Sequence, residues 1–409
     1  MDKRLKEYAR LAVRQGNNLR KGQTLLLRAP VECAEFARLI AEEAYAAGAG
    51  EVITDWSDDT MTRLKYLHAD DKVFDTVRPW IKERYDTLAD EDFALMTVYA
   101  EDPEALKGVD PDRIRRASAA SGNALKDYYD KMMRSDFSWC VVSVPVLSWA
   151  KKVFPEKTDK EAMDALWDAI YETLRIDGSG SAVEKWAEHT AKLHENAEKL
   201  NALKLVSLHY ENSLGTDFTV GLPEGYRFLG GAEKNRKDVE FIANMPTEEI
   251  FTAPAKYSGN GVICASRPLC LNGTLVKDIR FTVENGKIVK EEASEGLETL
   301  KKALEIDEGA RYFGELALVE YDSPISKQGI VYYNTLFDEN AACHIAFGNA
   351  YPDCVRGAEN FSSEEYEKAG LNASFAHEDF MIGTADLSIV GTTKDGTEVV
   401  IFKNGNFAL

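Results

Sequence analysis

Apolar runs and helical spacing in the first half of the chain follow a repeating order. An apolar run at 23–28 is followed by apolar residues at helical spacing over 32–47, by Gly-Ala-Gly at 48–50, and by a second apolar run at 51–56. Short apolar runs are typical of buried strands, and glycine is typical of the residue that ends a helix. This order predicts a β-α-β unit.

Two further apolar runs, at 93–99 and 139–145, are separated by charged stretches with helical spacing. Strands that alternate with helices favour a mostly parallel sheet covered by helices, so we expect a Rossmann-like α/β domain at the N-terminus. The helical stretch 158–203 then predicts a connector. No glycine-rich nucleotide fingerprint follows a predicted strand, which argues against a dinucleotide cofactor.

The second half consists of short strand-like runs joined by turn residues. Asn-Gly pairs stand at 272–273 and 285–286, and both central residues of a type I′ hairpin turn favour positive φ. A single helix is expected near 294–305. The pattern predicts an α+β C-terminal domain with a largely antiparallel sheet, and we place the domains at 1–200 and 201–409.

Composition narrows the class of protein. The 409 residues are 44% hydrophobic and 29% charged, as expected of a globular chain long enough for two cores. The net charge of −20 argues against nucleic acid as a partner and favours a cationic substrate group.

No uninterrupted apolar stretch of about 18 residues or signal-peptide core is present, so we expect a cytoplasmic protein without membrane contact. The six cysteines form no Cys-x-x-Cys pair and are expected to be buried small residues.

Four short islands in the second half place acidic, histidine or tyrosine residues among apolar neighbours. In the first, Glu248 and Glu249 lead into the strand-like run 250–252, although a solvated loop with a helix cap fits the same residues. In the second, strand alternation puts Glu315 on the opposite face from Leu316. A buried carboxylate needs a compensating partner, whereas an exposed first residue of the strand would need none.

The third island, 336–351, carries Asp338, Glu339, His344 and Tyr351. His344 lies in a nearly all-apolar run and is expected to be buried, either as a hydrogen-bonded core histidine or as a metal ligand.

The fourth island is His377-Glu378-Asp379. Strand alternation places His377 and Asp379 on one face and Glu378 on the other. The pair fits a chelate for one ion, and it fits equally well a histidine that is oriented by an acid.

Together the islands indicate a site of nitrogen and oxygen donors, which Zn²⁺, Co²⁺ and Mn²⁺ accept. Such a set activates water for hydrolysis. A dimetal hydrolase, such as an amidohydrolase or phosphoesterase, and a non-catalytic metal-binding assembly protein both remain compatible with these residues.

The residue sequences of these four islands resemble those of a known family. The segments 244–254, 314–319, 335–351 and 377–383 are similar, in order and spacing, to successive motifs of the thermophilic-type leucyl aminopeptidases, the group of aminopeptidases T, S and PepS. The first half agrees at 8–16 and 43–49. The resemblance implies a metal-dependent exopeptidase that acts on peptides with a free N-terminus. It also implies two divalent ions (Zn²⁺, Co²⁺ or Mn²⁺) and a homodimer, with an N-terminal domain that shapes substrate access or dimer contacts.

The resemblance also implies roles for individual residues. The metal ligands would be Glu249, Glu315, Glu339, His344, His377 and Asp379. Glu315 is the expected bridging ligand of two ions that lower the pKa of a shared water, and Tyr351 is expected to donate a hydrogen bond to the oxyanion. Glu248, Glu320 and Glu378 are left as alternatives for the general base.

Overall fold

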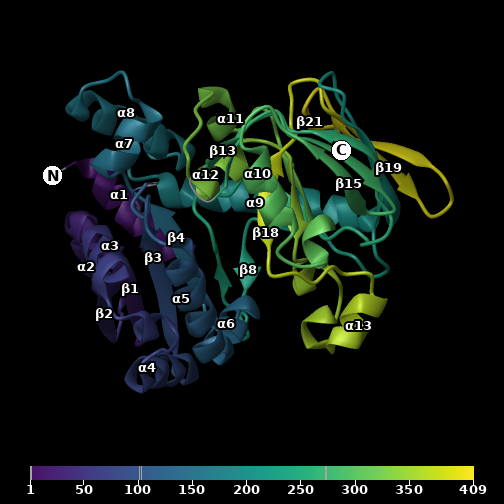
Figure 1. Ribbon diagram of the computed structural model, residues 1–409. Helices are drawn as coiled ribbons and strands as arrows, with labels where there is room; N and C mark the ends of the chain where they lie inside the picture. The colour runs from purple at the N-terminus through teal and green to yellow at the C-terminus, as the bar shows by residue number, and fades with distance from the viewer. Residues whose placement is uncertain (1, 101, 103, 272–273) are drawn as a thin grey trace. The chain divides into compact units, whose positions relative to one another are not determined.

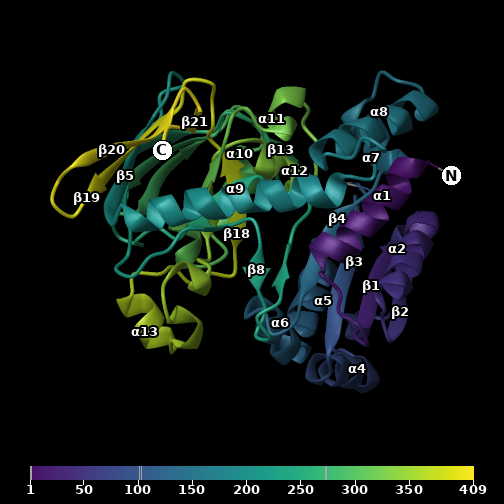
Figure 2. The same cartoon turned by 180° about the vertical axis from the view of Figure 1, so that it is seen from behind.

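The computed structural model describes residues 2–100, 102, 104–271 and 274–409 (Figure 1). The chain divides into a first unit, Met1–Glu188 with Ala232–Pro246, and a second unit, His189–Gly231 with Thr247–Leu409. The division falls inside one long helix, α9 (Ala182–Ala202), whose full length is visible in Figure 2. The boundary expected from the sequence lies near the C-terminal end of the same helix.

The first unit is built on a four-stranded sheet in the order β2-β1-β3-β4, in which every neighbouring pair is parallel. The strands are β1 (Thr24–Pro30), β2 (Glu51–Ser57), β3 (Phe93–Tyr99) and β4 (Trp139–Ser143). The helices are α1 (Lys3–Leu11), α2 (Ala34–Ala47), α3 (Asp59–His68), α4 (Pro79–Asp90), α5 (Pro111–Ala124), α6 (Lys126–Met133), α7 (Leu147–Val153) and α8 (Asp159–Thr173). A small ladder pairs β8 (Glu233–Lys234) with β9 (Glu240–Phe241).

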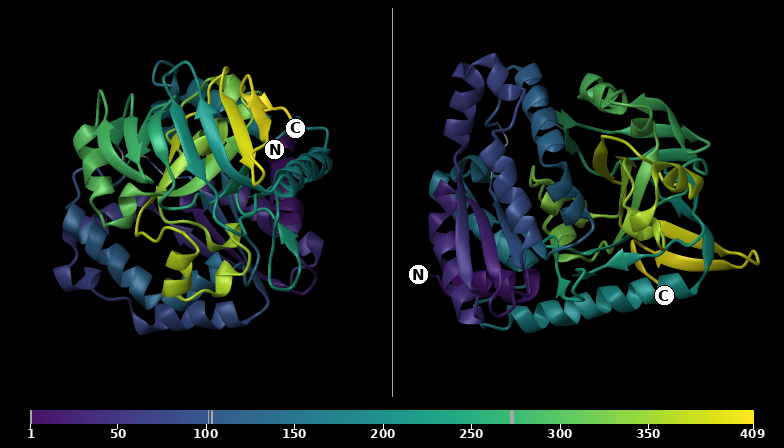
Figure 3. Two further views of the ribbon diagram at one scale, coloured as in Figure 1. Left: turned by 90° about the vertical axis from the view of Figure 1, so that its right-hand side faces the viewer. Right: turned by 90° about the horizontal axis from the view of Figure 1, so that it is seen from below.

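Both faces of this sheet are covered by helices, as the right-hand view of Figure 3 shows. Leu26 of β1 packs in a buried cluster with Leu88 of α4 and Tyr128 of α6. The α2 helix packs against β1 and ends at Gly48, whose φ of 97° is a left-handed conformation that glycine adopts without strain. The predicted β-α-β unit and parallel sheet are confirmed.

The second unit contains two antiparallel sheets, of eight and five strands, with the orders β15-β14-β11-β6-β5-β19-β20-β21 and β18-β17-β16-β10-β7. The strands of the larger sheet are β5 (Leu205–Glu211), β6 (Asp217–Gly221), β11 (Asn260–Cys264), β14 (Arg280–Glu284), β15 (Lys287–Glu292), β19 (Ser388–Thr393), β20 (Glu398–Lys403) and β21 (Asn406–Phe407). Those of the smaller sheet are β7 (Leu229–Gly230), β10 (Glu249–Thr252), β16 (Phe313–Val319), β17 (His344–Gly348) and β18 (His377–Met381).

The remaining elements of the second unit are short. They are β12 (Leu269–Leu271), β13 (Thr274–Val276), α10 (Leu297–Leu304), α11 (Pro324–Gln328), α12 (Thr335–Asp338) and α13 (Ser363–Lys368). The hairpin predicted at 285–286 is confirmed: Asn285 and Gly286 join β14 to β15 with φ of 48° and 79°. The hairpin turn predicted from the Asn-Gly pair at 272–273 lies outside the described residues.

The two sheets of the second unit share one hydrophobic core. Phe281 of β14 lies 5.1 Å from Phe380 of β18 between ring centroids, and Phe218 of β6 lies 5.7 Å from Phe313 of β16. Leu316 belongs to the same buried cluster. This core therefore occupies one face of the five-stranded sheet, and the side chains on the opposite face of the sheet point away from it. Among the described residues, no helix is both long and apolar enough to cross a membrane.

We predict that Phe281→Ala destabilises the second unit by about 3–5 kcal/mol, because it leaves a cavity where the two sheets meet. Val289→Ala, on the neighbouring strand β15 and 46% exposed, is the control and should change stability by less than about 0.5 kcal/mol. Urea unfolding followed by far-ultraviolet circular dichroism, which reports on the strands of the second unit, measures both. Equal, small effects would contradict a core shared by the two sheets.

Candidate metal centre

The face of the five-stranded sheet that points away from the shared core carries acidic and histidine side chains. On β16 and β17, Leu316 and Ile345 point into the core, so period-two alternation directs Glu315 and His344 to the other face. The same rule on β18 places His377 and Asp379 opposite the core residue Phe380. Four strands of one sheet thus bring donors together from positions distant in sequence, because Glu249 begins β10 beside β16.

Small residues make room between these donors. Ala346 of β17 pairs with Glu315 on one side and with Asp379 on the other, and Ala317 pairs with His344. Each alanine lies on the same face as the donors and is fully or almost fully buried. Because a methyl group is short, the longer side chains on either side can converge above it.

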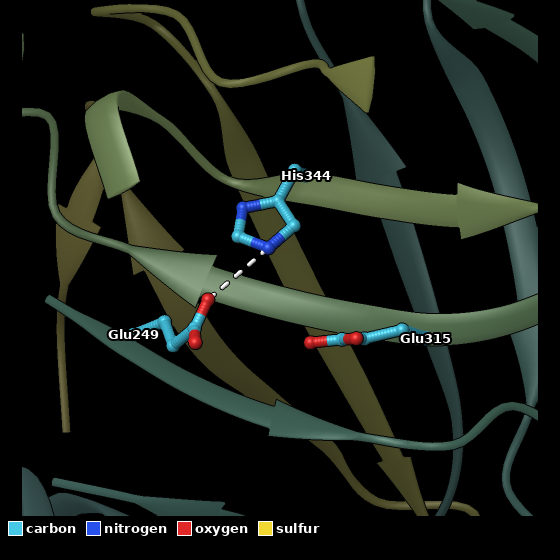
Figure 4. A group of neighbouring side chains, drawn as sticks. All are labelled: Glu249, Glu315 and His344. Carbon is cyan, nitrogen blue, oxygen red and sulfur yellow. Dashed lines mark ion pairs between the residues drawn. The ribbon is translucent and has the colours of Figure 1, made fainter. Parts of the chain in front are cut away.

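The donors form two overlapping groups. The carboxylates of Glu249 and Glu315 and the imidazole of His344 offer donor atoms that all lie within 4.8 Å of one another, and so do Glu315, His377 and Asp379. Figure 4 shows Glu249, Glu315 and His344 converging from three neighbouring strands. The Nε2 atom of His344 is 3.2 Å from Glu249 Oε2, and the Nε2 atom of His377 is 3.2 Å from Glu315 Oε2. Glu315 belongs to both groups.

Backbone carbonyls orient both imidazoles. Nδ1 of His344 donates to the Ala342 carbonyl at 3.0 Å, and Nδ1 of His377 donates to the Asn349 carbonyl at 2.8 Å. A carbonyl only accepts, so the proton of each neutral ring is at Nδ1 and the lone pair at Nε2 faces the carboxylates. This is the arrangement that metal-ligating histidines adopt.

Asp379 and Glu339 complete the set. Asp379 is 3.9 Å from His344 Nε2 through Oδ1 and 3.6 Å from His377 Nε2 through Oδ2. Its buried Oδ1 has no hydrogen-bond partner among the residues that the structure describes. A buried carboxylate oxygen without a partner is costly unless a cation compensates it. Glu339 and Asp379 line a small cavity together with Leu269, Cys270, Thr335, Asp338 and Met381. The donors therefore fit a divalent cation that binds oxygen and nitrogen.

Burial dominates the electrostatics of the cluster. It raises the pKa of Glu315 to about 7, and burial together with the charges of Glu249 and Asp379 raises the pKa of Glu339 well above its usual value. Burial opposes protonation of His377, but the charges of Asp379 and Glu315 outweigh it and raise the pKa of His377 to about 10. In the absence of cations, the cluster therefore holds protons at neutral pH.

Tyr351 lies beside this cluster. Its ring centroid is 4.9 Å from that of His377 and 5.8 Å from that of Phe251. Burial and the nearby carboxylates, Glu315 first among them, raise the pKa of Tyr351 well above its usual value. The hydroxyl therefore keeps its proton and is a hydrogen-bond donor at neutral pH.

The structure also decides between alternatives that the sequence left open. Glu315 is 4% exposed and lies within an entirely buried strand, so it is not an exposed first residue. Glu249 is the first residue of a strand rather than part of a solvated loop. Asp338 accepts hydrogen bonds from the backbone of Tyr332 and Asn334, which is a structural role in its loop.

The three residues considered as general base, Glu248, Glu320 and Glu378, have surroundings that differ from those of the proposed metal donors. Glu320 pairs with Lys192 at 2.6 Å. Glu248 is buried with one oxygen 3.5 Å from His189 Nε2. Glu378 pairs with Phe347 across the strands, on the face opposite to Asp379, and burial raises its pKa to about 7.

Sequence reasoning missed the groups that shape the centre without donating to it. The carbonyls of Ala342 and Asn349 have no sequence signature, because every residue carries a carbonyl. The alanines at 317 and 346 do leave a trace, since small residues alternate there with large apolar ones in two predicted strands.

Comparison with known proteins gives the centre its context. Residues 1–407 match the family described as thermophilic metalloprotease (M29). The chain belongs to this M29 metalloprotease family. It is 42% identical to aminopeptidase AmpS of Bacillus subtilis (strain 168) over 99% of this chain and 98% of that protein. It is likewise 42% identical to aminopeptidase 2 of Geobacillus stearothermophilus, over all of this chain and 98% of that one.

Solved structures agree with this M29 assignment. The wild-type AmpT structure from Thermus thermophilus superposes with a TM-score of 0.92 at 38% identity, covering 99% of both chains. A 2,5-dihydroxypyridine dioxygenase from Pseudomonas putida KT2440 shares the fold alone, with a TM-score of 0.57 at 11% identity over 99% of this chain and 96% of that one. The predicted family, the α/β plus antiparallel α+β fold class and the hydrolase class, an exopeptidase, are confirmed, and so is the use of a divalent metal.

We predict that Ala346→Leu prevents metal binding although no donor is removed, because the longer side chain occupies the space where Glu315 and Asp379 converge. The control is Ala303→Leu in helix α10, which is also buried. Both changes overpack a buried position and should cost about 1–3 kcal/mol of stability, but only the first should reduce the metal content after dialysis. Equal metal content in the two folded variants would contradict the role given to Ala346.

Proposed function

We propose that this chain is an aminopeptidase with a two-metal centre in its second unit, which hydrolyses the first peptide bond of substrates with a free N-terminus. The observation that carries the proposal is the place of Glu315 in both donor groups, since a carboxylate shared by two groups can bridge two ions. The names of the curated relatives, all aminopeptidases, support the substrate class.

The proposed ligands share burial and convergence on one sheet face or its rim. They are Glu249, Glu315, Glu339, His344, His377 and Asp379. Four of these six are carboxylates and two are imidazoles whose Nδ1 protons point to carbonyls. With the four carboxylates ionised and both rings neutral, the set carries four negative charges. Two divalent cations balance that charge, whereas a single one leaves two buried negative charges uncompensated.

Divalent ions at such a site supply Lewis-acid polarisation and a water of lowered pKa. The chain supplies the rest. The carbonyls of Ala342 and Asn349 keep the proton of each imidazole at Nδ1, so that Nε2 stays available throughout turnover. The protonated hydroxyl of Tyr351 would donate a hydrogen bond to the substrate carbonyl oxygen as that oxygen gains negative charge. The acidic character of the chain, with a net charge of −20, attracts the α-ammonium of the substrate.

Other features expected from the sequence stay predictions. These are the homodimer, the cytoplasmic location, the identity of the ions as Zn²⁺, Co²⁺ or Mn²⁺, and the part of the first unit in shaping substrate access. A preference for leucine or any other first residue also stays open to measurement.

The test is reconstitution of the metal-free protein. Chelator-treated protein should be inactive on aminoacyl-p-nitroanilides and recover activity with Co²⁺, Zn²⁺ or Mn²⁺ until two ions per chain are bound. The N-acetylated substrate should not be cleaved. Asp379→Asn should abolish metal-dependent turnover, whereas Glu378→Gln, the same acid-to-amide change on the opposite face of β18, should be mild.

Three outcomes would contradict the proposal. Activity that survives chelation would exclude the metal, and saturation at one ion per chain would exclude the two-metal centre. Cleavage of phosphate esters, with no cleavage of aminoacyl substrates, would favour the phosphoesterase alternative.

We predict that Tyr351→Phe lowers kcat by roughly 10²- to 10³-fold, because one hydrogen-bond donor to the developing oxyanion is lost. KM should change little, since the interaction strengthens only in the transition state. The control is Tyr210→Phe, which removes a hydroxyl buried in the core of the same unit that has no hydrogen-bond partner among the described residues. Steady-state kinetics at saturating metal measure both variants. A rise in KM with unchanged kcat would assign Tyr351 to substrate binding instead.

A further inference from the structure

The peptide group between Thr247 and Glu248 is held by side chains at both of its polar atoms. Nε2 of His189, on α9, lies 2.9 Å from the Thr247 carbonyl oxygen, and the Glu248 amide donates to Oδ1 of Asn340 at 2.8 Å. This peptide group immediately precedes Glu249, the first residue of β10. The place where β10 begins, and with it the position of Glu249, is therefore set from two sides.

Asn340 contacts a second donor-bearing segment at the same time. It directly follows Glu339, and its Nδ2 donates to the Leu336 carbonyl at 3.2 Å and approaches Glu339 Oε1 at 3.4 Å. The side chain is fully buried. One amide thus joins the start of β10 to the segment that carries Glu339, although the two are far apart in the sequence.

The chemistry of an amide suits this place. The carboxyl groups of Glu249 and Glu339 lie close enough to interact electrostatically, so a link between their backbones is best made by a group that adds no charge. An aspartate here would add a further negative charge, and a lysine or arginine would pair with Glu339 and compete with the metal. An apolar residue would leave the Glu248 amide without its acceptor. Asparagine supplies both an acceptor and donors while remaining neutral.

We propose that Asn340 is a positioning residue for the metal centre: it sets the separation of Glu249 and Glu339 before metal binds and thereby tightens metal binding at the centre. The inference rests on the ligand assignment made under the proposed function. Asn340 itself contacts neither substrate nor reacting atoms. Its removal should therefore weaken metal affinity while leaving kcat at saturating metal close to that of the wild type.

The experiment is calorimetric titration of the metal-free full-length protein with Co²⁺. Asn340→Ala removes all the hydrogen bonds of the amide, and Asn340→Asp keeps its shape and its acceptor but introduces a charge. In both, the Kd for one of the two ions should rise by roughly 10- to 100-fold, as is typical when a group that orients a metal ligand is lost. The visible absorption of bound Co²⁺ provides a second readout that is independent of activity.

The control is Asn201→Ala in the same unit. Asn201 also bridges backbone groups through both ends of its amide, donating to the Phe228 carbonyl at 3.0 Å and accepting from the Phe228 amide at 2.7 Å. Its loss should lower stability without changing the Kd for Co²⁺. The comparison separates loss of two backbone hydrogen bonds from loss of metal-site geometry.

Each result bears on one proposal or the other. Kd values within about 3-fold of the wild type in both folded variants would overturn the inference. Failure of both variants to fold, while Asn201→Ala folds, would also overturn it, because the amide would then serve the fold rather than the metal. If the wild-type protein itself binds no Co²⁺, the ligand assignment fails and the inference with it. If the wild type binds two ions and the variants do so equally well, only the inference fails.

Discussion

Burial of several carboxylates in one small volume is the constraint on which the second unit depends. Glu315 is almost completely buried, and Asp379 has a buried oxygen for which the described part of the chain offers no hydrogen-bond partner. Glu339 lies in the electrostatic field of both Glu249 and Asp379. Such a cluster is tolerable only with positive charge at its centre, from protons or from metal ions. The cores, turns and loops around it can be understood as the means of assembling this cluster.

The five-stranded sheet can assemble this cluster because its two faces carry different kinds of side chain. One face contributes large apolar side chains such as Leu316 and Phe380 to the core shared with the eight-stranded sheet, and that packing fixes the strand register. A shift by one residue would exchange the faces and place the acids in the core. The same strand register therefore determines both the hydrophobic core and the candidate metal centre.

Short-range sequence patterns predicted much of this structure. The glycine-ended helix, the Asn-Gly hairpin at 285–286 and the period-two alternation around Glu315 and His377 each have a short-range physical cause, and the structure agrees with all three. The sequence did not reveal that 232–246 packs with the first unit, because that depends on contacts between distant segments. It also did not reveal the carbonyls of Ala342 and Asn349 as orienting groups, since a backbone atom looks the same at every position. The donors were found because acids and histidines among apolar residues are unusual, and long motifs similar to those of a known family supported them.

The order of strands in the smaller sheet has a consequence for the dynamics of the protein. Strand β18, which carries His377 and Asp379, is at the edge of that sheet and, in the part of the chain that the structure describes, pairs with β17 alone within it. Edge strands separate from a sheet more readily than central ones, since fewer backbone hydrogen bonds must break. In the proposed centre, an ion bound to β18 and to Glu315 of the central strand β16 would act as a cross-link that holds the edge strand in place. Fraying of this edge and release of the ion would then be one coupled equilibrium, so that metal occupancy sets the local stability of the sheet as well as the activity.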